Sequence, residues 1–293
     1  MRVGFIGFGG AGYGLAKGLK QAGLADISFF DSLRETPPHG DVIRRHALET
    51  GAISKENIAG LIHAAEIVIS CVTGSVALAV AEQAAACLKP GHLFVDVNTA
   101  SPRTMEAVGA VIQSTGAAFA DVAMMGAVPA FLNRVPCLAS GNGAERFKTA
   151  MGPYGMDITC VGGIPGQASA IKMFRSIFMK GLLALLMEML SATHQYQVDA
   201  VVLSSIAKTM EKSAFLEIVR LQMAKGVISA ERMSHEMDAV VATLTEMGLP
   251  AVMASATREK LKWCSRMELD KHFGAEMPDS LDEILAVMEE KNR

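Results

Sequence analysis

The chain has 293 residues, of which 51% are hydrophobic and 19% charged, a composition that predicts a large folded core and excludes a disordered chain. The formal net charge is −3, from 27 basic and 30 acidic residues, and aromatic residues make up only 5%. Because nucleic-acid-binding proteins use a basic field or aromatic stacking platforms, this composition argues against a nucleic-acid partner.

The five cysteines are widely spaced, and no CxxC pair occurs among them. This pattern predicts free thiols in a reducing cytoplasm, with neither a disulfide framework nor a metal site. The apolar run 171–190 is long enough for a membrane span, but Lys172, Arg175, Lys180 and Glu188 interrupt it. We therefore expect a cytoplasmic protein without a membrane partner.

The first half of the chain alternates short apolar runs, rich in β-branched residues, with Ala-rich segments of helical periodicity. The predicted strands cover residues 2–7, 25–31, 66–72, 92–97 and 117–124. The predicted helices lie between them, at 12–23, around 42–48, and at 75–88 and 102–116. Further short strands near 136–139 and 156–160 extend the sheet. This alternation is typical of an α/β fold with a Rossmann-type, doubly wound and mostly parallel sheet.

After Gly166 the pattern changes, because nearly every segment has helical periodicity dominated by Met and Leu. A long interdomain helix is predicted over 167–195, and shorter helices follow it, with breaks near Gly226, 248–250 and 274–278. The sequence GGIPG at 162–166 supplies turn residues at the boundary. We therefore predict a Rossmann-type domain over residues 1–163 and an all-α domain over 164–293.

The hexamer GFGGAG, residues 7–12, matches the pattern G-x-G-x-x-G between a predicted strand and a predicted helix. The first glycine permits the tight turn, the second lets the backbone approach a pyrophosphate, and the third allows close helix–strand packing. Unpaired N–H groups at the start of the helix favour an anion there. We predict that a dinucleotide contacts this turn at Gly7, Phe8, Gly9, Gly10, Ala11 and Gly12.

Asp31 ends the second predicted strand, 19 residues beyond Gly12, at the spacing expected for a carboxylate that binds the ribose. Ser32 follows it and is predicted to contact the cofactor as well. The carboxylate would repel the 2′-phosphate of NADP, so NAD is the predicted cofactor. Arg34 could bind that phosphate if its loop folds back, which leaves NADP as the alternative.

Two further pairs of residues follow predicted strands. Val72 and Thr73 lie at the end of the strand at 66–72, and Asn98 and Thr99 come after the strand at 92–97. Open parallel sheets bind ligands beyond the carboxyl ends of their strands. We therefore predict that these four residues contact the cofactor.

Four stretches, taken in order, resemble the β-hydroxyacid dehydrogenase family, which includes 3-hydroxyisobutyrate and 6-phosphogluconate dehydrogenases. GFIGFGGAG at 4–12 resembles the family's cofactor turn, and DVNTASP at 96–102 resembles its D-x-[ST]-T-x-x-P segment, with Asn98 in place of a Ser. DVAMMGA at 121–127 lies where the family carries a substrate-binding D-A-P-V-S-G-G. GQASAIKM at 166–173 resembles the motif G-x-x-x-x-x-K, with which the family's catalytic helix begins.

The resemblance covers the whole chain and points to an uncharacterised branch, through ASAIKM…KGL, LASG at 138–141 and HEMDAV at 235–240. That branch pairs a 6-phosphogluconate-dehydrogenase-like NAD-binding domain with a distinct helical carboxy-terminal domain. The resemblance implies that the long helix joins the two domains and that the helical domains form a homodimer. It also implies an active site in the interdomain cleft, where an NAD(P)-dependent dehydrogenase acts on a CH–OH group.

Two departures from the family's pattern concern the substrate. Residues 124–127 lack the serine that holds a carboxylate, and Arg175 and Ser176 follow Lys172 at positions where the family carries Asn. We predict that Met125, Gly126, Arg175 and Ser176 contact the substrate, which then differs from the substrates typical of the family.

Lys172, Ser176 and Lys180 are spaced i, i+4, i+8 and so lie on one face of the predicted long helix. By the resemblance, Lys172 is the general acid/base, which takes the hydroxyl proton as hydride leaves the substrate carbon. Arg175 or Lys180 could hold a carboxylate or phosphate, which predicts a small anionic substrate. The alternative for these two cations is that they extend from an amphipathic helix into solvent.

The leading hypothesis is therefore hydride transfer between a nicotinamide and a hydroxy acid or related small alcohol, with Lys172 as acid/base. One alternative is an imine reductase on the same scaffold, although relatives of that kind usually carry another residue at the position of Lys172. The other is a non-catalytic NAD-binding sensor, suggested by the altered substrate positions.

Overall fold

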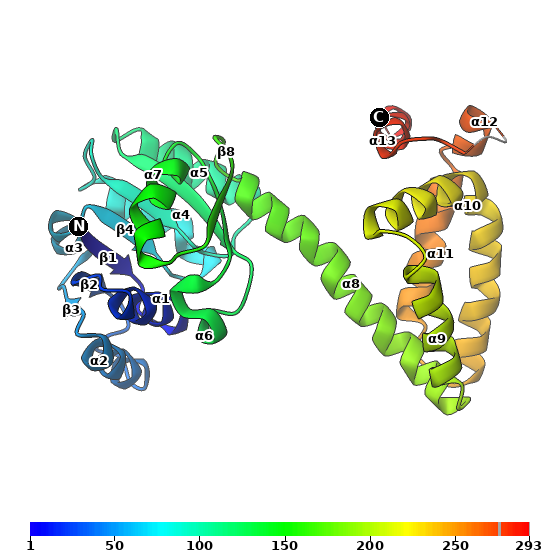
Figure 1. Cartoon of the computed structure of the whole chain (residues 1–293), viewed down its shortest axis with the longest axis horizontal. Helices are drawn as coiled ribbons and strands as arrows, with labels where there is room; N and C mark the ends of the chain where they lie inside the picture. Colours follow the sequence, from blue (N-terminus) through cyan, green and yellow to red (C-terminus); the bar gives the residue numbers. More distant parts are fainter. Residues whose placement is uncertain (275–276, 293) are drawn as a thin grey trace. The chain divides into compact units, whose positions relative to one another are not determined.

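The computed structural model describes residues 1–274 and 277–292, which form two compact units, Met1–Ile177 (unit 1) and Phe178–Arg293 (unit 2). The predicted fold class is confirmed, because unit 1 contains a Rossmann-like sheet and unit 2 consists of helices (Figure 1). Helix α8 (Gln167–Gln195) is continuous over 29 residues, and the division between the units falls within it. Its first turns, with Lys172 and Arg175, therefore belong to unit 1.

The sheet of unit 1 has eight strands within the described residues, in the order β3-β2-β1-β4-β5-β6-β7-β8. All neighbouring strands are parallel except β6 and β7. Every predicted strand is present, and the one that the sequence did not predict is the two-residue β3. The bounds are β1 (Arg2–Ile6), β2 (Asp26–Phe30), β3 (Ile53–Ser54), β4 (Ile67–Ser70), β5 (Leu93–Asp96), β6 (Ala118–Met124), β7 (Cys137–Ser140) and β8 (Ile158–Gly162).

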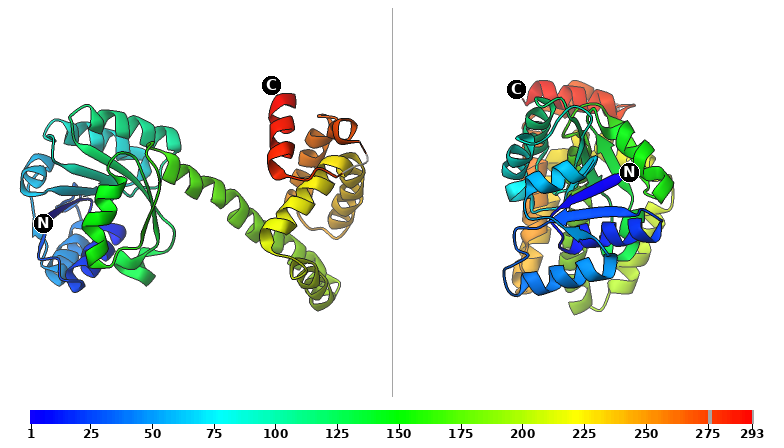
Figure 2. Two further views of the ribbon diagram at one scale, coloured as in Figure 1. Left: turned by 45° about the horizontal axis from the view of Figure 1, so that its top comes forward. Right: turned by 90° about the vertical axis from the view of Figure 1, so that its left-hand side faces the viewer.

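Helices cover both faces of this sheet, as Figure 2 shows, and each face has its own apolar core. One core is completed by α1 (Gly10–Gln21), α2 (His39–Thr50) and α7 (Ala144–Met151). The other is completed by α3 (Ile58–Ala64), α4 (Ala77–Ala85) and α5 (Pro102–Gln113). Central strands such as β4 and β5 are buried along their whole length, as strands packed on both faces must be. Short helical turns are α6 (Val128–Phe131), η1 (Gly74–Val76), η2 (Leu132–Arg134) and η3 (Gly152–Tyr154).

Local sequence signals set several helix ends in unit 1. The Ser101 side chain accepts a hydrogen bond from the Thr104 N–H, and Pro102 occupies the first turn of α5. Asn57 caps α3 through the Gly60 N–H in the same way. Gly51 ends α2 in the left-handed region, which a residue without a Cβ adopts at little cost.

Unit 2 contains the remainder of α8 and five further helices: α9 (Asp199–Met210), α10 (Phe215–Glu246), α11 (Val252–Ser265), α12 (Leu269–Phe273) and α13 (Leu281–Lys291). The predicted break at 248–250 is confirmed, because α10 ends before it and α11 begins after it. The predicted break near Gly226 is confirmed to within three residues, because α10 consists of two helical segments joined at a kink at Ser229, whose backbone angles are not helical. Of the predicted break at 274–278, residues 275 and 276 lie outside the described residues.

The apolar core of unit 2 is small. Its buried members come from α10, α12, α13 and the turn between α11 and α12, and they are Ala224, Val227, Met267, Leu269, Ile284 and Val287. Helix α9 buries none of its residues. Among the helices that the structure describes, none is both long enough and apolar enough to cross a bilayer.

Candidate functional site

The Gly-rich turn follows β1 at the point where the strand order reverses. Strands β2 and β4 lie on either side of β1, and the chain reaches them in opposite directions along the sheet. A crevice therefore opens beyond the carboxyl ends of β1 and β4, the position where doubly wound sheets bind ligands. The predicted cofactor residues Gly7–Gly12, Val72 and Thr73 all follow these two strands.

The turn contains four glycines, of which two are required for steric reasons and two leave the surface open. Gly7 has φ +90°, and a Cβ there would lie 2.4 Å from the Cys71 carbonyl oxygen. A Cβ on Gly12 would lie 2.3 Å from the Gly7 carbonyl oxygen, so α1 packs closely on the turn. A Cβ on Gly9 or Gly10 would meet no atom within 4 Å. These two positions leave open the surface that a pyrophosphate needs.

Helix α1 begins at Gly10, and no side chain caps its first turn. Its leading N–H groups therefore face the open side of the turn, where the helix dipole favours an anion. Phe8, by contrast, contributes only backbone to this surface, because its ring is fully buried and stacks on Phe29 at 4.2 Å between centroids.

Asp31 fixes the shape of the turn. Its carboxylate accepts hydrogen bonds from the Phe8 N–H (2.7 Å) and the Leu33 N–H (2.8 Å). On the opposite side, the Phe8 carbonyl oxygen lies 3.0 Å from His46 Nδ1. The Arg34 guanidinium lies 3.6 Å from the Glu35 carboxylate and 5.4 Å from the centre of the Phe30 ring.

A cavity of about 510 Å³ lies against this turn. It brings together six of the predicted cofactor residues: Gly7, Gly9, Asp31, Ser32, Val72 and Thr73. The sequence did not predict the other part of its lining, which comes from η1 and α4 and consists of Val76, Ala79, Val80 and Gln83. These four residues are spaced i, i+3, i+4, i+7, so the sequence pattern places them on one face of a helix.

Asn98 lies beyond the carboxyl end of β5 and is buried. Its backbone N–H and its Nδ2 donate to the two carboxylate oxygens of Asp96, at 2.8 and 2.9 Å, and Nδ2 also lies 3.0 Å from Ser70 Oγ. Its Oδ1 is the buried side-chain polar atom without a hydrogen-bond partner among the described residues. Burial, with a smaller contribution from neighbouring Asp121, raises the pKa of Asp96 to about 7.

Lys172 meets Thr99 beyond the same edge of the sheet. Its Nζ donates to Thr99 Oγ1 at 3.2 Å, although the two residues are 73 positions apart in the sequence. Lys172 is half-buried and Thr99 is exposed. Since β1, β4 and β5 are parallel neighbours, this contact and the Gly-rich turn lie beyond the same ends of the strands.

The other predicted residues of α8 differ in their surroundings. The Ser176 hydroxyl donates to the Lys172 carbonyl oxygen at 3.0 Å, so the helix backbone engages it. Arg175 is exposed in unit 1, and Lys180 is exposed in unit 2. Met125 and Gly126 follow β6, and the Met125 N–H donates to the Pro136 carbonyl oxygen at 2.7 Å.

A buried carboxylate that the sequence did not single out organises the start of α8. Asp121, in β6, accepts hydrogen bonds from Gly166 N–H (3.0 Å), Ser169 N–H (3.1 Å), Ser169 Oγ (2.7 Å) and Ser140 Oγ (3.2 Å). No short sequence motif predicts this cluster, because Asp121 and Ser169 are 48 residues apart.

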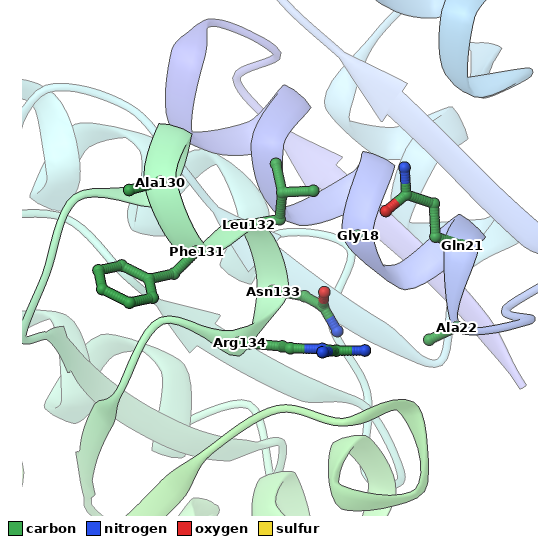
Figure 3. Close-up of a pocket in the computed structure, with 8 residues that line it drawn as sticks. All are labelled: Gly18, Gln21, Ala22, Ala130, Phe131, Leu132, Asn133 and Arg134. Atoms are coloured by element: carbon green, nitrogen blue, oxygen red, sulfur yellow. The ribbon is translucent and has the colours of Figure 1, made fainter.

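A second cavity, of about 480 Å³, lies at the carboxyl-terminal turn of α1 (Figure 3). Gln21 lines it from α1, Phe131 from the end of α6, and Asn133 and Arg134 from η2. Asn133 is buried and donates to the Tyr154 carbonyl oxygen at 2.7 Å. None of the residues predicted to bind cofactor or substrate lines this cavity.

The described residues contain no cluster of three His, Cys, Asp or Glu side chains that could hold a metal ion. All five cysteines are free thiols in the structure. Burial raises the pKa of Cys71 and raises that of Cys137 to about 12, so both are protonated near neutral pH.

Comparison with known protein families gives two matches. Residues 2–162 match the family described as the NAD binding domain of 6-phosphogluconate dehydrogenase. Residues 193–264 match a domain of unknown function (DUF1932). The first match spans the sheet and the Gly-rich turn, and confirms the prediction of an NAD(P)-binding domain.

Solved structures resemble the chain over nearly its whole length. A conserved protein of unknown function, reported as structurally similar to 3-hydroxyacid dehydrogenases, is 32% identical, with coverage of 92% of this chain and 98% of that one and a TM-score of 0.62. A conserved hypothetical protein from Sinorhizobium meliloti 1021 is 29% identical, with coverage of 99% and 96% and a TM-score of 0.65. An imine reductase from Aspergillus terreus, in complex with NADPH4, shares the fold at 18% identity, with coverage of 90% and 93% and a TM-score of 0.72.

Proposed function

Because this chain belongs to the family of the 6-phosphogluconate dehydrogenase NAD-binding domain, we propose that it is an NAD(P)-dependent oxidoreductase acting on a CH–OH group. The substrate is a small, anionic hydroxy acid or a related alcohol. The observation that carries this proposal is the contact of Lys172 Nζ with Thr99 Oγ1, beyond the same strand ends as the Gly-rich turn.

The residues of the turn fit a dinucleotide. Gly9 and Gly10 leave space for a pyrophosphate, the uncapped start of α1 supplies N–H donors, and the Asp31 carboxylate is held at the ribose position. When bound, the oxidised nicotinamide supplies the hydride acceptor. The protein's own contribution is to hold the substrate carbon near it and to move one proton.

Lys172 moves that proton. As hydride leaves the substrate carbon, the O–H bond breaks, its electron pair forms the carbonyl, and the neutral Lys172 amine takes the proton. In reverse, the ammonium returns the proton to the carbonyl oxygen. Thr99 Oγ1 orients the amine, and Arg175, three residues after Lys172, supplies positive charge for the anionic group of the substrate.

The test is oxidation of a panel of hydroxy acids by the purified protein, followed through the absorbance of the reduced nicotinamide. Lys172→Ala is expected to lower kcat by ~100-fold or more while NADH affinity persists. Lys89→Ala, which removes an exposed lysine of unit 1, is the matched control and should leave kcat unchanged. Turnover that survives in Lys172→Ala would contradict the role of the lysine.

The same assay separates the alternatives. Reduction of cyclic imines without oxidation of any hydroxy acid would favour an imine reductase, the activity of the Aspergillus terreus relative by fold. NADH binding without turnover on either panel would favour a non-catalytic NAD sensor.

We also propose a preference for NAD over NADP. The Asp31 carboxylate stands where a 2′-phosphate would bring a second negative charge, and Arg34 is engaged with Glu35 and Phe30. Isothermal titration should give at least ~10-fold weaker binding of NADPH than of NADH. Asp31→Ser should reduce that ratio, and equal affinities in the unmodified protein would contradict the preference.

Finally, we propose that unit 2 forms a homodimer. Apolar side chains stay exposed along its part of α8 and along α9, at Phe178, Leu183, Met187, Val201, Leu203 and Met210. Exposed apolar side chains that gather on neighbouring helices are typical of an interface. The proposed occupant is a second copy of the chain, which presents the same surface, because the resemblance to the β-hydroxyacid dehydrogenases implies a homodimer through the helical domains.

A further inference from the structure

The buried Asp121 carboxylate supplies hydrogen-bond acceptors to the start of α8. An α-helix leaves its first N–H groups without intrahelical partners, and these are commonly satisfied by a neighbouring side chain in the sequence. In α8 the partners come from the sheet instead: Asp121 accepts from Gly166 N–H and Ser169 N–H, at 3.0 and 3.1 Å. Ser140 Oγ accepts from Ala168 N–H at 3.0 Å, and itself donates to Asp121.

This cluster is rigid for two reasons. All of Asp121, Ser140 and Ser169 are buried, so each hydrogen bond has little competition from water. Gly166 has φ +93°, and a Cβ there would lie 2.8 Å from the Pro102 carbonyl oxygen, so the chain enters α8 along one tightly packed path. The negative charge of the carboxylate also suits the positive end of the helix dipole.

Lys172 lies one turn after Ser169, and its position follows from where this first turn is held. Its partner Thr99 is held from the neighbouring strand. Asp96 is the register partner of Asp121, and its carboxylate accepts from Asn98, the residue before Thr99, at 2.8 and 2.9 Å. Adjacent positions of β5 and β6 thus support the two sides of the Lys172–Thr99 contact.

We propose that Asp121 is a positioning residue, which fixes the first turn of α8 on the sheet and thereby holds the Lys172 amine at Thr99. Its effect on catalysis rests on the proposed function, in which Lys172 moves the proton. The geometric statement, that Asp121 sets the place of the amine, does not depend on which substrate is used.

A cap that only stabilises the fold would act differently from a positioning residue. It would lower the free energy of unfolding and leave the place of the amine in the folded protein unchanged. Asp121→Asn keeps the size of the side chain but loses the charge and one acceptor oxygen. Asn133→Ala is the matched control, because it also removes a buried polar side chain of unit 1, one that donates to Tyr154 and lines the cavity of Figure 3.

The first measurement reads the amine directly. Reductive methylation of the full-length protein with ¹³C-formaldehyde makes each lysine visible by NMR, and Lys172→Arg identifies the Lys172 resonance by its absence. We expect a Lys172 resonance distinct from those of exposed lysines, shifted toward them in Asp121→Asn and unchanged in Asn133→Ala. A Lys172 resonance that Asp121→Asn leaves in place would overturn the proposal.

The second measurement uses turnover of a hydroxy acid from the panel. Displacement of an acid/base by about 1 Å costs on the order of 100-fold in rate. Asp121→Asn should therefore lower kcat by that factor, with the KM for NAD within about 3-fold, and Asn133→Ala should change neither. An unchanged kcat in Asp121→Asn would overturn the proposal. If no substrate turns over, the proposed function fails, while the NMR measurement still decides the role of Asp121.

Discussion

The two units of the chain differ in how much apolar surface they bury for themselves. Unit 1 encloses two cores, one on each face of its sheet, with residues such as Phe5, Leu19 and Phe119 fully buried. Unit 2 has one small core, and α9 buries none of its residues, with Val201 72% exposed. Apolar burial is the main favourable term in folding.

This difference indicates a division of tasks. Unit 1 has the core of an independent domain and carries the Gly-rich turn, the cavity beside it and the Lys172–Thr99 contact. Unit 2 has helices whose apolar side chains are exposed, which is the surface that we propose a second copy covers. We therefore expect perturbations of unit 2 to act on assembly, and perturbations of unit 1 to act on the cofactor and the reaction.

The largest effect is expected from a charge on the apolar surface of unit 2. Leu203→Asp would place a carboxylate in the proposed dimer interface, where a buried unpaired charge costs several kcal/mol. Sedimentation velocity should show at least ~100-fold weaker dimerisation, while unit 1 still binds NADH. Lys225→Asp, at an exposed lysine of α10 outside the proposed interface, is the control and should leave the dimer intact. A Leu203→Asp protein that sediments like the unmodified dimer would place the interface elsewhere.

Two glycine substitutions test whether unit 1 is the more tightly packed unit. Gly12→Ala would drive a Cβ to 2.3 Å from the Gly7 carbonyl oxygen, and should lower the free energy of unfolding by roughly 1–3 kcal/mol and abolish NADH binding. Gly226→Ala, in α10, meets no atom within 4 Å and should stabilise unit 2 by roughly 0.5–1 kcal/mol. Urea denaturation measures both. A neutral Gly12→Ala would show that α1 is not held against the turn.

The pH dependence of the free energy of unfolding should report on a buried carboxylic acid of unit 1, Asp96. The pKa of Asp96 is raised from 3.8 to about 7 in folded unit 1, so between these values the folded protein keeps a proton that the unfolded chain has lost. The contribution is therefore fully present below pH 3.8, and is lost as the pH rises to about 7. The slope is at most about 1.4 kcal/mol per pH unit. Asp96→Asn should flatten it in denaturation experiments from acid to neutral pH, and an unchanged slope would assign it to another group.

The smallest effect is expected from an exposed ion pair of unit 2. Arg232 and Glu236 lie one turn apart in α10, and both side chains are mostly exposed. Solvent screens such pairs, so Glu236→Ala should change the free energy of unfolding by no more than ~0.5 kcal/mol. A larger change would show that this face of α10 is covered in the assembled protein. In that case the change in the free energy of unfolding should increase with protein concentration.

The sequence predicted those parts of the fold that local patterns determine. Strands buried on both faces, such as β4, stand out as continuous apolar runs, and the helix from Gln167 to Gln195 has an unbroken periodicity. The two-residue strand β3 escaped because Ile53 lies on an exposed edge. The break predicted near Gly226 occurs at Ser229, because one glycine costs a helix only about 1 kcal/mol and does not by itself fix where the backbone leaves the helical region.

The residues of the candidate site also differ in whether a local sequence pattern predicts them. The Gly-rich turn was predictable because Gly7, Gly9 and Gly12 act within one short stretch, and Asp31 follows at a fixed spacing. The roles of Asp121 and Ser169 were not, because the hydrogen bonds that join them connect a strand to a helix 48 residues later. The partnership of Lys172 with Thr99 likewise depends on the order of strands in the sheet.

The Oδ1 atom of Asn98 has a consequence for binding affinity. This oxygen is buried and has no hydrogen-bond partner among the described residues, while the Nδ2 of the same side chain is fixed by Ser70 and Asp96. An exposed acceptor must release water before it can bind a ligand, whereas the fold itself already shields this oxygen from bulk solvent. A ligand hydroxyl or amide that reaches Asn98 therefore gains a hydrogen bond without that desolvation. Part of the free-energy cost of binding has thus already been met when the protein folds.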